Sequence, residues 1–375
     1  MTGGLEGAAA EPLRIAMVGL GWAGSSIWLP RLRRHPRYTV SAVVDPAPQA
    51  PGVLAAEGID APLFTDAGRL PPDLADLAVV AVPNHLHAAV ATGLLARGTP
   101  VFLEKPVCLS SAEARQLTAA ERAGGTVLLA GSAARYRADV AVLREAVGSL
   151  GRIRHVDLEW VRARGVPNGN GWFTRASLAG GGALLDLGWH LLDTLTSLLG
   201  PVRFDQAVGT VSGDFVNQGA ARADWRAEEP SPGGPGNVED TARAFLVTDE
   251  GVSVTLRAAW ASHRATDVTR IRVDGSDGSA ALECTFGFSP NRVARPRVTR
   301  TTDGVTTELP VPAEEIGAEY ARQLDELPGL LADSALRGRA AEDAARAIGV
   351  IERIYRSAHK AHTAPALVPS PERQR

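Results

Sequence analysis

The stretch that decides the fold is LRIAMVGLGWAG, residues 13–24. Its first seven residues form an apolar run, which predicts a strand buried on both faces of a sheet. A GxGxxG turn follows and opens a predicted helix over 22–34. In such a turn the first glycine permits the tight bend, the second lets a pyrophosphate approach the backbone, and the third lets the helix pack on the strand. The residues expected to contact a bound dinucleotide here are Gly19, Gly21, Trp22, Ala23 and Gly24.

A single acid further along the chain indicates which dinucleotide is bound. Asp45 ends the second predicted strand, over 40–45, and follows Gly24 by 21 residues. A carboxylate at this spacing accepts hydrogen bonds from an adenosine ribose and repels a 2′-phosphate. No arginine follows within the next twenty positions. The sequence therefore predicts NAD as the cofactor in preference to NADP.

The N-terminal half alternates apolar strands with helical stretches, which is typical of βαβ units in a parallel sheet. Helices are expected at 85–97 and from Ser110 or Ser111 to about residue 123, where a serine can cap the first turn. The predicted strands are 13–19, 40–45, 61–64, 77–82, 100–106 and 126–131. Six strands with helical crossovers predict a complete doubly wound α/β sheet, the Rossmann fold, over residues 12–150.

The pattern changes after residue 151, where polar and apolar residues alternate and Asp-Gly turns recur. This texture predicts a C-terminal α+β domain over 151–362, built on a large, mostly antiparallel and meandering open sheet. Predicted strands lie within 155–162, 203–213, 241–260, 270–282 and 295–309, and predicted helices near 183–199, 314–333 and 339–359. Residues 226–237 are expected to form a flexible loop, and residues 1–11 and 363–375 disordered tails.

Composition excludes several classes of protein. The 375 residues carry 39 basic and 42 acidic side chains, a formal net charge of −3, so neither nucleic acid nor an anionic membrane is the expected partner. No apolar run approaches the roughly 20 residues of a membrane span, and the N-terminus does not read as a signal peptide. Cys108 and Cys284 show no metal-site spacing, so no metal is predicted. A reduced, cytoplasmic setting fits best.

Removal of a hydride from a carbinol needs a base for the hydroxyl proton and positive charge near the developing alkoxide. Asp186, His190 and Asp193 share one face of the predicted helix. We expect His190 to accept the proton, with Asp186 as a partner that orients the imidazole and favours its charged form. The alternative is a buried histidine that makes structural hydrogen bonds. Asp193 is expected to be structural.

Lys105 is one of only two lysines in the chain, against 37 arginines, and it follows the fifth predicted strand. Parallel sheets bind ligands at that carboxyl edge. An ammonium is a compact charge with a tunable pKa, unlike a guanidinium, so we expect Lys105 to polarise the reacting oxygen and join the proton relay. We also expect Lys105 to contact the cofactor. The alternative is a solvated lysine at a strand end. Glu104 is expected to position the cofactor or Lys105.

Other polar residues are expected around the same edge. Pro83, Asn84 and His87 follow the fourth strand, where a nicotinamide ribose should pass, although Asn84 equally suits a helix cap and His87 a packing role. Arg135, Arg162 and Trp172 are the expected substrate contacts, with His190. The loop that holds Arg162 and Trp172 equally suits a subunit contact. If Arg162 or Arg164 faces the pocket, an anionic substrate such as a nucleotide sugar is favoured.

Four motifs occur in the order of a known family. These are the Gly19–Gly24 loop, AVPNHLH at 81–87, EKP at 104–106 and GGGALLDLGWHLLD at 180–193. Over residues 13–360 the chain resembles the glucose–fructose oxidoreductase, inositol dehydrogenase and rhizopine-catabolism family of NAD(P)-dependent oxidoreductases. The resemblance implies a cis Pro106. It also implies a sugar, cyclitol or related polyol as substrate, and a homodimer or homotetramer formed through the open sheet. Ala133 departs from the asparagine that many relatives carry two residues before Arg135.

The leading interpretation is an enzyme, a dehydrogenase or reductase that moves a hydride between NAD(P) and a secondary carbinol or ketone. A second is an NAD-dependent glycoside hydrolase of the same fold, which returns the hydride to its substrate. A third is a non-catalytic NAD-binding regulator, which predicts the loss of catalytic side chains. The sequence retains Lys105, Asp186 and His190, so the first interpretation is preferred.

Overall fold

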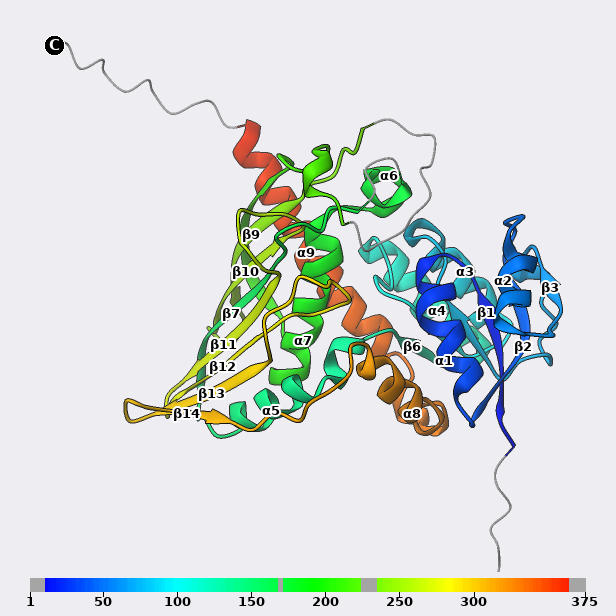
Figure 1. The fold of residues 1–375 in the computed structure, drawn as a ribbon, viewed down its shortest axis with the longest axis horizontal. Helices are drawn as coiled ribbons and strands as arrows, with labels where there is room; N and C mark the ends of the chain where they lie inside the picture. Colours follow the sequence, from blue (N-terminus) through cyan, green and yellow to red (C-terminus); the bar gives the residue numbers. More distant parts are fainter. Residues whose placement is uncertain (1–10, 168–170, 224–234, 364–375) are drawn as a thin grey trace, which may run out of the picture.

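The computed structural model describes residues 11–167, 171–223 and 235–363, and it contains two sheets that lie side by side along the long axis (Figure 1). Helices fill the space between the two sheets. The tails expected to be disordered fall almost wholly outside the described residues, as does most of the loop expected at 226–237.

The N-terminal sheet has six parallel strands in the order β3-β2-β1-β4-β5-β6, the order of a doubly wound dinucleotide-binding fold. The predicted fold class is confirmed. Its strands are β1 (Leu13–Val18), β2 (Tyr38–Val44), β3 (Leu63–Phe64), β4 (Leu77–Val80), β5 (Val101–Leu103) and β6 (Leu128–Ala130). All four residues of β4 are buried, as an apolar run in a sheet covered on both faces requires.

The helices of this half follow the sequence closely at their starts. The Ser110 hydroxyl accepts a hydrogen bond from the Glu113 amide at 3.2 Å, so the predicted cap opens the fourth helix. The first predicted helix begins with a π-helical segment. The elements are η1 (Ala23–Trp28), α1 (Leu29–Arg34), α2 (Ala50–Glu57), η2 (Ala67–Arg69), α3 (Asn84–Ala96), α4 (Ser111–Gly124), η3 (Ala133–Tyr136) and α5 (Ala138–Val147). Helix α5 was not predicted from the sequence.

The C-terminal sheet has eight strands in the order β14-β13-β12-β11-β7-β10-β9-β8. It is mostly antiparallel, as predicted, but it is not a simple meander, because β7 lies between β10 and β11 and pairs with β10 in parallel. The strands are β7 (Ile153–Val161), β8 (Phe204–Ser212), β9 (Thr241–Thr248), β10 (Ser253–Ala259), β11 (Val268–Gly275), β12 (Ser279–Cys284), β13 (Arg297–Thr302) and β14 (Val305–Leu309).

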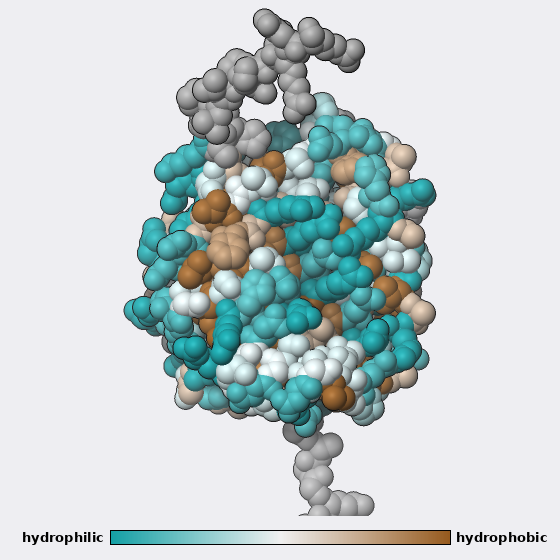
Figure 2. All heavy atoms as spheres, turned by 90° about the vertical axis from the view of Figure 1, so that its left-hand side faces the viewer, coloured by the Kyte–Doolittle hydropathy of each residue, from teal (hydrophilic) through white to brown (hydrophobic). Residues whose placement is uncertain are grey.

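One face of this sheet is covered by helices and the other is open. Figure 1 shows α7 and α9 on the side that faces the N-terminal half. Figure 2 shows the open face, which is largely hydrophilic with scattered apolar side chains. Val208 and Phe245, paired across β8 and β9, are 63% and 50% exposed there. The remaining elements are η4 (Trp172–Thr174), α6 (Ala176–Ala179), η5 (Leu184–Gly188), α7 (Trp189–Leu199), η6 (Gly219–Ala221), α8 (Ala318–Ala332), η7 (Ser334–Leu336) and α9 (Arg339–Thr363).

Helix α8 packs on the N-terminal half, although its residues were predicted to belong to the 151–362 domain. Leu324 and Leu327 are fully buried in the same apolar cluster as Trp28 and Phe102. The Tyr38 hydroxyl donates a hydrogen bond to the Leu324 carbonyl. The C-terminal segment therefore completes the core of the cofactor half. Nowhere in the described residues is a helix both long enough and apolar enough to cross a bilayer.

Candidate active site

The glycine turn after β1 leaves room for a ligand at one position only. Gly19 has a φ of +94°, and a Cβ there would lie 2.7 Å from the Ala81 carbonyl oxygen. A Cβ on Gly24 would lie 2.0 Å from the Gly19 carbonyl oxygen. A Cβ on Gly21, by contrast, would meet no heavy atom within 4 Å. Crowded first and third glycines with an open second one are what a bound pyrophosphate requires, so the turn fits a dinucleotide.

Asp45 lies where the sequence places it, just past the end of β2. Its two carboxylate oxygens accept hydrogen bonds from the amides of Leu20, at 2.6 Å, and Ala47, at 2.8 Å. These bonds tie the acid to the glycine turn and fix its position. The turn itself continues into Trp22, whose ring packs edge-on against Phe288 at 5.7 Å, and Ala23, the first residue of η1.

Lys105 and Asp186 meet, although 81 positions separate them in the sequence. Lys105 follows β5 at the carboxyl edge of the parallel sheet, and its Nζ donates to Asp186 Oδ1 at 2.7 Å. The buried indole of Trp260 donates from Nε1 to the other carboxylate oxygen at 2.9 Å. The carboxylate is 8% exposed and the ammonium 21%. Two donors in different directions hold Asp186 in one orientation.

His190 lies one helical turn beyond Asp186, and its ring packs against that of Trp160 at 5.4 Å. Burial, assisted by the positive charges of Lys105 and Arg162, lowers the pKa of His190 to about 3, and the opposing effect of Asp186 is weaker. Asp186 does favour the charged imidazole, as expected, but desolvation and two cations outweigh this one carboxylate, which Lys105 already neutralises. His190 is neutral at physiological pH and has a lone pair that can accept a proton.

A buried acid, Glu239, anchors the helix that carries Asp186 and His190. It was not predicted from the sequence. The Glu239 carboxylate accepts hydrogen bonds from the amides of Gly182 and Leu184, at 3.0 and 2.9 Å, and from the Tyr355 hydroxyl at 2.8 Å. A Cβ on Gly182 would lie 1.7 Å from the Glu239 carbonyl oxygen, which explains one glycine of the GGG motif. No local pattern predicts this contact, because it joins residues 57 positions apart.

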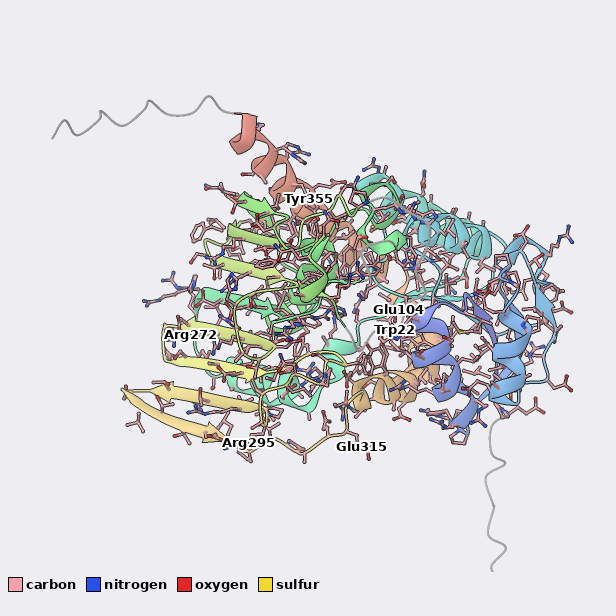
Figure 3. All side chains as sticks on the ribbon, turned by 45° about the horizontal axis from the view of Figure 1, so that its top comes forward. Trp22, Glu104, Arg272, Arg295, Glu315 and Tyr355 are labelled. Atoms are coloured by element: carbon pink, nitrogen blue, oxygen red, sulfur yellow. The ribbon has the colours of Figure 1, made fainter. Side chains whose placement is uncertain are left out.

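Glu104 precedes Lys105 in the chain and holds the backbone there in place. Its carboxylate accepts from the Trp28 indole and from the Lys105 amide, both at 2.8 Å, and burial raises its pKa. The expected contact with Lys105 is thus made through the backbone, and the expected cis bond before Pro106 is present. Figure 3 shows Glu104 and Trp22 near the junction of the two halves, with Tyr355 on α9 and Arg272 and Arg295 out on the large sheet.

The residues after β4 mainly join elements together. Helix α3 begins at Asn84, with Pro83 as its capping residue, and the Asn84 amide donates to the Ala179 carbonyl at 3.0 Å, so the cap alternative is wrong. The ring nitrogens of His87 lie 2.7 Å from the Pro106 carbonyl oxygen and 2.8 Å from that of Val82. Burial lowers the pKa of His87 to about 4. These contacts agree with the packing role weighed for His87.

The three expected substrate residues lie in different surroundings. The Arg162 guanidinium lies over the Trp160 ring at 5.2 Å, beside His190, and Arg162 is 7% exposed. Trp172 packs on Phe173 at 4.9 Å, next to residues 168–170, which lie outside the described residues.

Arg135 forms ion pairs with acids on α7 and α9. It contacts Asp193, whose carboxylate also accepts from Ser132 at 3.2 Å, and it lies 3.7 Å from Asp343. Asp193 is thus held in an ion pair, as its predicted structural role requires.

An aromatic cluster lies at the junction between the two halves. It was not predicted from the sequence. The Tyr320 ring on α8 stacks on Phe288 at 5.5 Å and meets Trp28 edge-on at 5.4 Å. Arg31 lies over the same ring at 5.4 Å. The charge of Asp186 is among the causes that raise the pKa of Tyr320, so the cluster lies near Asp186.

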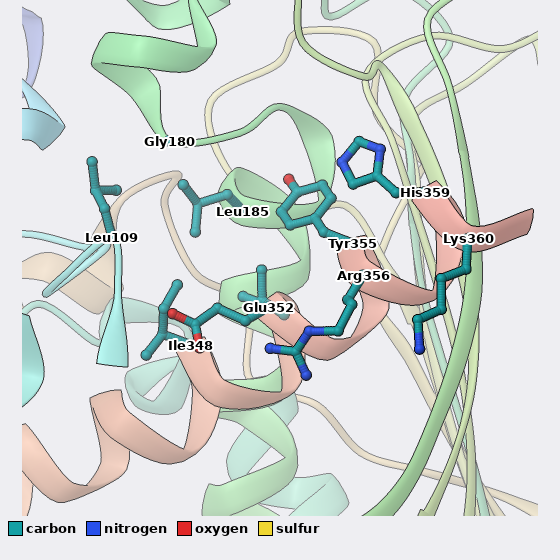
Figure 4. Close-up of a pocket in the computed structure, with 10 residues that line it drawn as sticks. Leu109, Gly180, Leu185, Ile348, Glu352, Tyr355, Arg356, His359 and Lys360 are labelled. Carbon is teal, nitrogen blue, oxygen red and sulfur yellow. The ribbon is translucent and has the colours of Figure 1, made fainter. Parts of the chain in front are cut away.

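A large hollow in the described part of the chain is not lined by Lys105, Asp186 or His190. Figure 4 shows it along α9, between Leu109 and Gly180 on one side and Tyr355, Arg356 and Lys360 on the other. Its volume is about 640 Å³, and it is open to solvent. We therefore infer the candidate active site from the side chains that come together at the sheet edge, and not from the size of a hollow.

A glycine turn shaped for a pyrophosphate, on a doubly wound sheet with a lysine, an acid and an imidazole at its carboxyl edge, defines a dinucleotide-dependent oxidoreductase. The sequence comparisons agree. Residues 13–132 match the model of the oxidoreductase family with an NAD-binding Rossmann fold, GFO/IDH/MocA, and residues 142–281 match the C-terminal domain model of that family. The chain belongs to the GFO/IDH/MocA family of oxidoreductases and has an NAD(P)-binding Rossmann domain.

Individual relatives extend this result along the whole chain. The putative UDP-kanosamine synthase oxidoreductase subunit of Amycolatopsis mediterranei (strain S699) is 57% identical over 350 residues, covering 93% of this chain and 97% of that protein. The solved structure of aldose-aldose oxidoreductase from Caulobacter crescentus, complexed with glycerol, has a TM-score of 0.74 at 22% identity and covers 94% and 98%. A mutant 3-ketoreductase from Actinomadura kijaniata, in complex with TDP-benzene and NADP, has a TM-score of 0.67 at 20% identity and covers 92% and 98%.

Proposed function

We propose that this oxidoreductase transfers a hydride between NAD and a secondary carbinol or ketone of a nucleotide-linked sugar, with Lys105, Asp186 and His190 as its catalytic residues. The observation that carries the proposal is the contact of Lys105 Nζ with Asp186 Oδ1 at 2.7 Å, beside a neutral His190. An ammonium, a carboxylate and an imidazole from distant parts of the chain meet at the sheet edge where dinucleotides bind.

Each of the three side chains has a distinct task. The nicotinamide, when bound, supplies or accepts the hydride. The Lys105 ammonium stabilises negative charge on the reacting oxygen, which is the largest electrostatic demand of the step. A ring nitrogen of His190 takes the carbinol proton during oxidation and returns it during reduction. Asp186 holds Lys105 in place, while the indoles of Trp160 and Trp260 exclude water from the cluster.

The substrate class rests on charge and on a relative. Arg162 lies beside His190 and is 7% exposed, a placement that suits an anionic group on the substrate. The relative that is 57% identical is named for UDP-kanosamine synthesis. Together these observations favour a UDP-linked hexose over a free sugar or cyclitol.

The cofactor preference rests on Asp45. Its carboxylate is fixed against the glycine turn, where a 2′-phosphate would meet its negative charge. We expect a kcat/KM for NAD at least tenfold above that for NADP. Asp45→Asn should narrow that ratio because it removes the repulsion, and an unchanged ratio would contradict this assignment.

The test is an absorbance assay at 340 nm with NAD and a panel of UDP-hexoses, free hexoses and cyclitols. Wild-type protein should form NADH fastest with a UDP-hexose. Lys105→Ala should lower kcat at least 100-fold, because charge stabilisation of this kind contributes several kcal/mol, about 3 or more, and it should change NAD affinity, measured by fluorescence titration, far less. Lys360→Ala, at the other lysine of the chain, is the matched control and should keep full activity.

Other outcomes point elsewhere. Sugar release without net NADH would favour the glycoside hydrolase alternative. Tight NAD binding with no turnover on any substrate would favour a non-catalytic regulator. Equal activity of Lys105→Ala and wild type would remove the catalytic assignment of the cluster.

We also propose that the open face of the C-terminal sheet is an assembly surface between copies of this chain. Val208 and Phe245 form an apolar pair on that face, and Figure 1 shows α7 and α9 on the opposite side of the sheet. Light scattering should give a dimer or tetramer mass for the wild type and a monomer mass for Phe245→Asp. A wild-type monomer at micromolar concentration would contradict the proposal.

A further inference from the structure

The loop that follows β12 extends from the large sheet to the cofactor half, and one arginine fixes its shape. The Arg292 guanidinium donates to three carbonyl oxygens of the loop, those of Thr285, Gly287 and Ser289, at 2.5, 2.6 and 3.2 Å. Gly287 has a φ of +74°, a conformation that glycine adopts without strain. Residues 285–292 therefore form one hydrogen-bonded unit that holds its side chains in set directions.

Two phenylalanines of this loop contact different parts of the molecule. Phe286 is buried, and its ring meets Trp160 edge-on at 5.4 Å within the C-terminal half. Phe288 lies on the cofactor half, where its ring stacks on Tyr320 of α8 at 5.5 Å and meets Trp22 edge-on at 5.7 Å. Phe288 therefore packs between α8 and the glycine turn.

The contact with Trp22 falls at the part of the turn that a dinucleotide approaches. Trp22 directly follows Gly21, where an added Cβ would meet no heavy atom within 4 Å. On one side of Gly21 the turn is held by Asp45, which accepts from the Leu20 amide at 2.6 Å. On the other side the Phe288 ring packs on Trp22. The open position for a pyrophosphate is thus flanked by a contact from each half of the molecule.

The same loop also lies beside the surroundings of the expected proton acceptor. The glycine turn belongs to the N-terminal half, whereas His190 lies in the C-terminal half. Phe286, two residues before Phe288, packs on Trp160, whose ring meets that of His190 at 5.4 Å. One hydrogen-bonded loop therefore connects the turn that fits a dinucleotide with the wall behind the catalytic imidazole.

We propose that Phe288 is a positioning residue for the cofactor, which holds Trp22, and with it the glycine turn, in the conformation that binds the dinucleotide. Trp22 contacts the bound dinucleotide, and Phe288 acts on it only through Trp22. Edge-on aromatic pairs at this separation are favourable beyond the area that they bury, so the ring restrains the indole. The inference rests on dinucleotide binding by the proposed oxidoreductase and not on its substrate.

The test is a double-mutant cycle on the full chain, with NADH affinity measured from the change in NADH fluorescence on binding. Phe288→Ala should weaken NADH binding about tenfold, because Trp22 loses the ring that restrains it. In a Trp22→Leu background the same change should have less than about a twofold effect, because the partner is already lost. Phe288→Ala should also raise the KM for NAD and leave the KM for the sugar unchanged. Phe215→Ala, which removes a ring packed edge-on against His263 in the C-terminal half, is the matched control and should bind NADH like the wild type.

Two results would overturn the proposal. One is an NADH affinity of Phe288→Ala equal to that of the wild type. The other is an equal loss of affinity in the Trp22→Leu background and in the wild type, which would mean that Phe288 does not act through Trp22. Thermal unfolding checks that each variant folds, and Phe288→Leu is a second, milder variant that keeps the cycle decisive. Binding of NADH without turnover of any sugar would contradict the proposed hydride transfer alone, since affinity is measured without substrate.

Discussion

At the scale of single residues, the orientation of Asp186 depends on an indole that no motif includes. Trp260 Nε1 donates to one carboxylate oxygen while Lys105 Nζ occupies the other. A hydrogen bond to a charged group contributes about 2 kcal/mol, and its loss leaves the carboxylate free to rotate away from the ammonium. Trp260 is therefore a positioning residue, and it acts on the reaction only through Asp186.

We expect Trp260→Phe to lower kcat about 30-fold, which is the equivalent of about 2 kcal/mol, with little change in KM. Trp160→Phe is the matched control, since Trp160 Nε1 has no hydrogen-bond partner in the described residues and the ring contact with His190 is retained. Equal losses in both variants would indicate general disruption of packing.

Buried His87 makes the stability of the protein depend on pH. Burial lowers its pKa to about 4, below the 6.5 of an unfolded histidine, although its two carbonyl contacts favour the charged ring. As the pH falls, His87 is therefore protonated in the unfolded chain before it is protonated in the folded protein. The stabilising contribution is complete above pH 6.5 and is lost as the pH falls from about 6.5 towards 4.

Urea titrations between pH 8 and 4 should show this effect. Wild-type stability should fall on acidification by a part that His87→Asn lacks, on the order of 3 kcal/mol. Between pH 7 and 8 the difference between the two proteins should stay constant, which serves as the internal control. Parallel curves over the whole range would contradict the assignment.

At the scale of elements, the helix that carries Asp186 and His190 is held at its start by Glu239, which lies just before β9. The Glu239 carboxylate accepts from two amides of the first turn and from Tyr355 on α9. We expect Glu239→Gln to lower the free energy of unfolding by about 1–3 kcal/mol, because the amide presents a donor to groups that are themselves donors. Glu250→Gln, the same change in the exposed turn between β9 and β10, should leave stability unchanged in the same urea titration.

The sequence predicted those elements whose cause is local. The apolar run before Gly19 and the serine before α4 each specify their element from neighbouring residues, and both predictions are confirmed. The order of β7 in its sheet was not predicted, because strand pairing is decided by contacts across the chain. Helix α5 was missed although its residues are ordinary helix formers.

The candidate site divides in the same way. Lys105, Asp186 and His190 were found because each lies in a recognisable motif at a strand end or on one helix face. Trp260 and Glu239 were missed, because each acts through a partner more than 50 positions away. The effect of Asp186 on the pKa of His190 has the predicted direction, but the larger opposing effect of burial was not predicted, because burial cannot be read from spacing.

At the scale of the whole molecule, α8 joins the two halves into one cooperative unit. Leu324 and Leu327 are fully buried against the cofactor half, and Tyr320 stacks with Phe288 from the other half. Leu324→Ala should lower the free energy of unfolding by about 2–5 kcal/mol, the range for a leucine removed from a packed core. Leu331→Ala, a partly buried position on the same helix, should cost less than half as much.

The measurement is urea unfolding followed at the same time by tryptophan fluorescence and by NAD affinity. Both signals should shift to lower urea together in Leu324→Ala, because the helix belongs to the core that holds the glycine turn. A shift of the fluorescence with no change in NAD affinity would mean that α8 does not stabilise the cofactor half.

The docking of α8 also has a consequence for synthesis on the ribosome. Translation delivers the six parallel strands first, yet the leucines that seal one side of them, Leu324 and Leu327, emerge only near the end of the chain. Until then the apolar surface that these leucines cover is exposed on the nascent sheet, and chaperones can bind it. A transcript truncated before residue 318 would yield a polypeptide with every cofactor motif and a lasting tendency to aggregate.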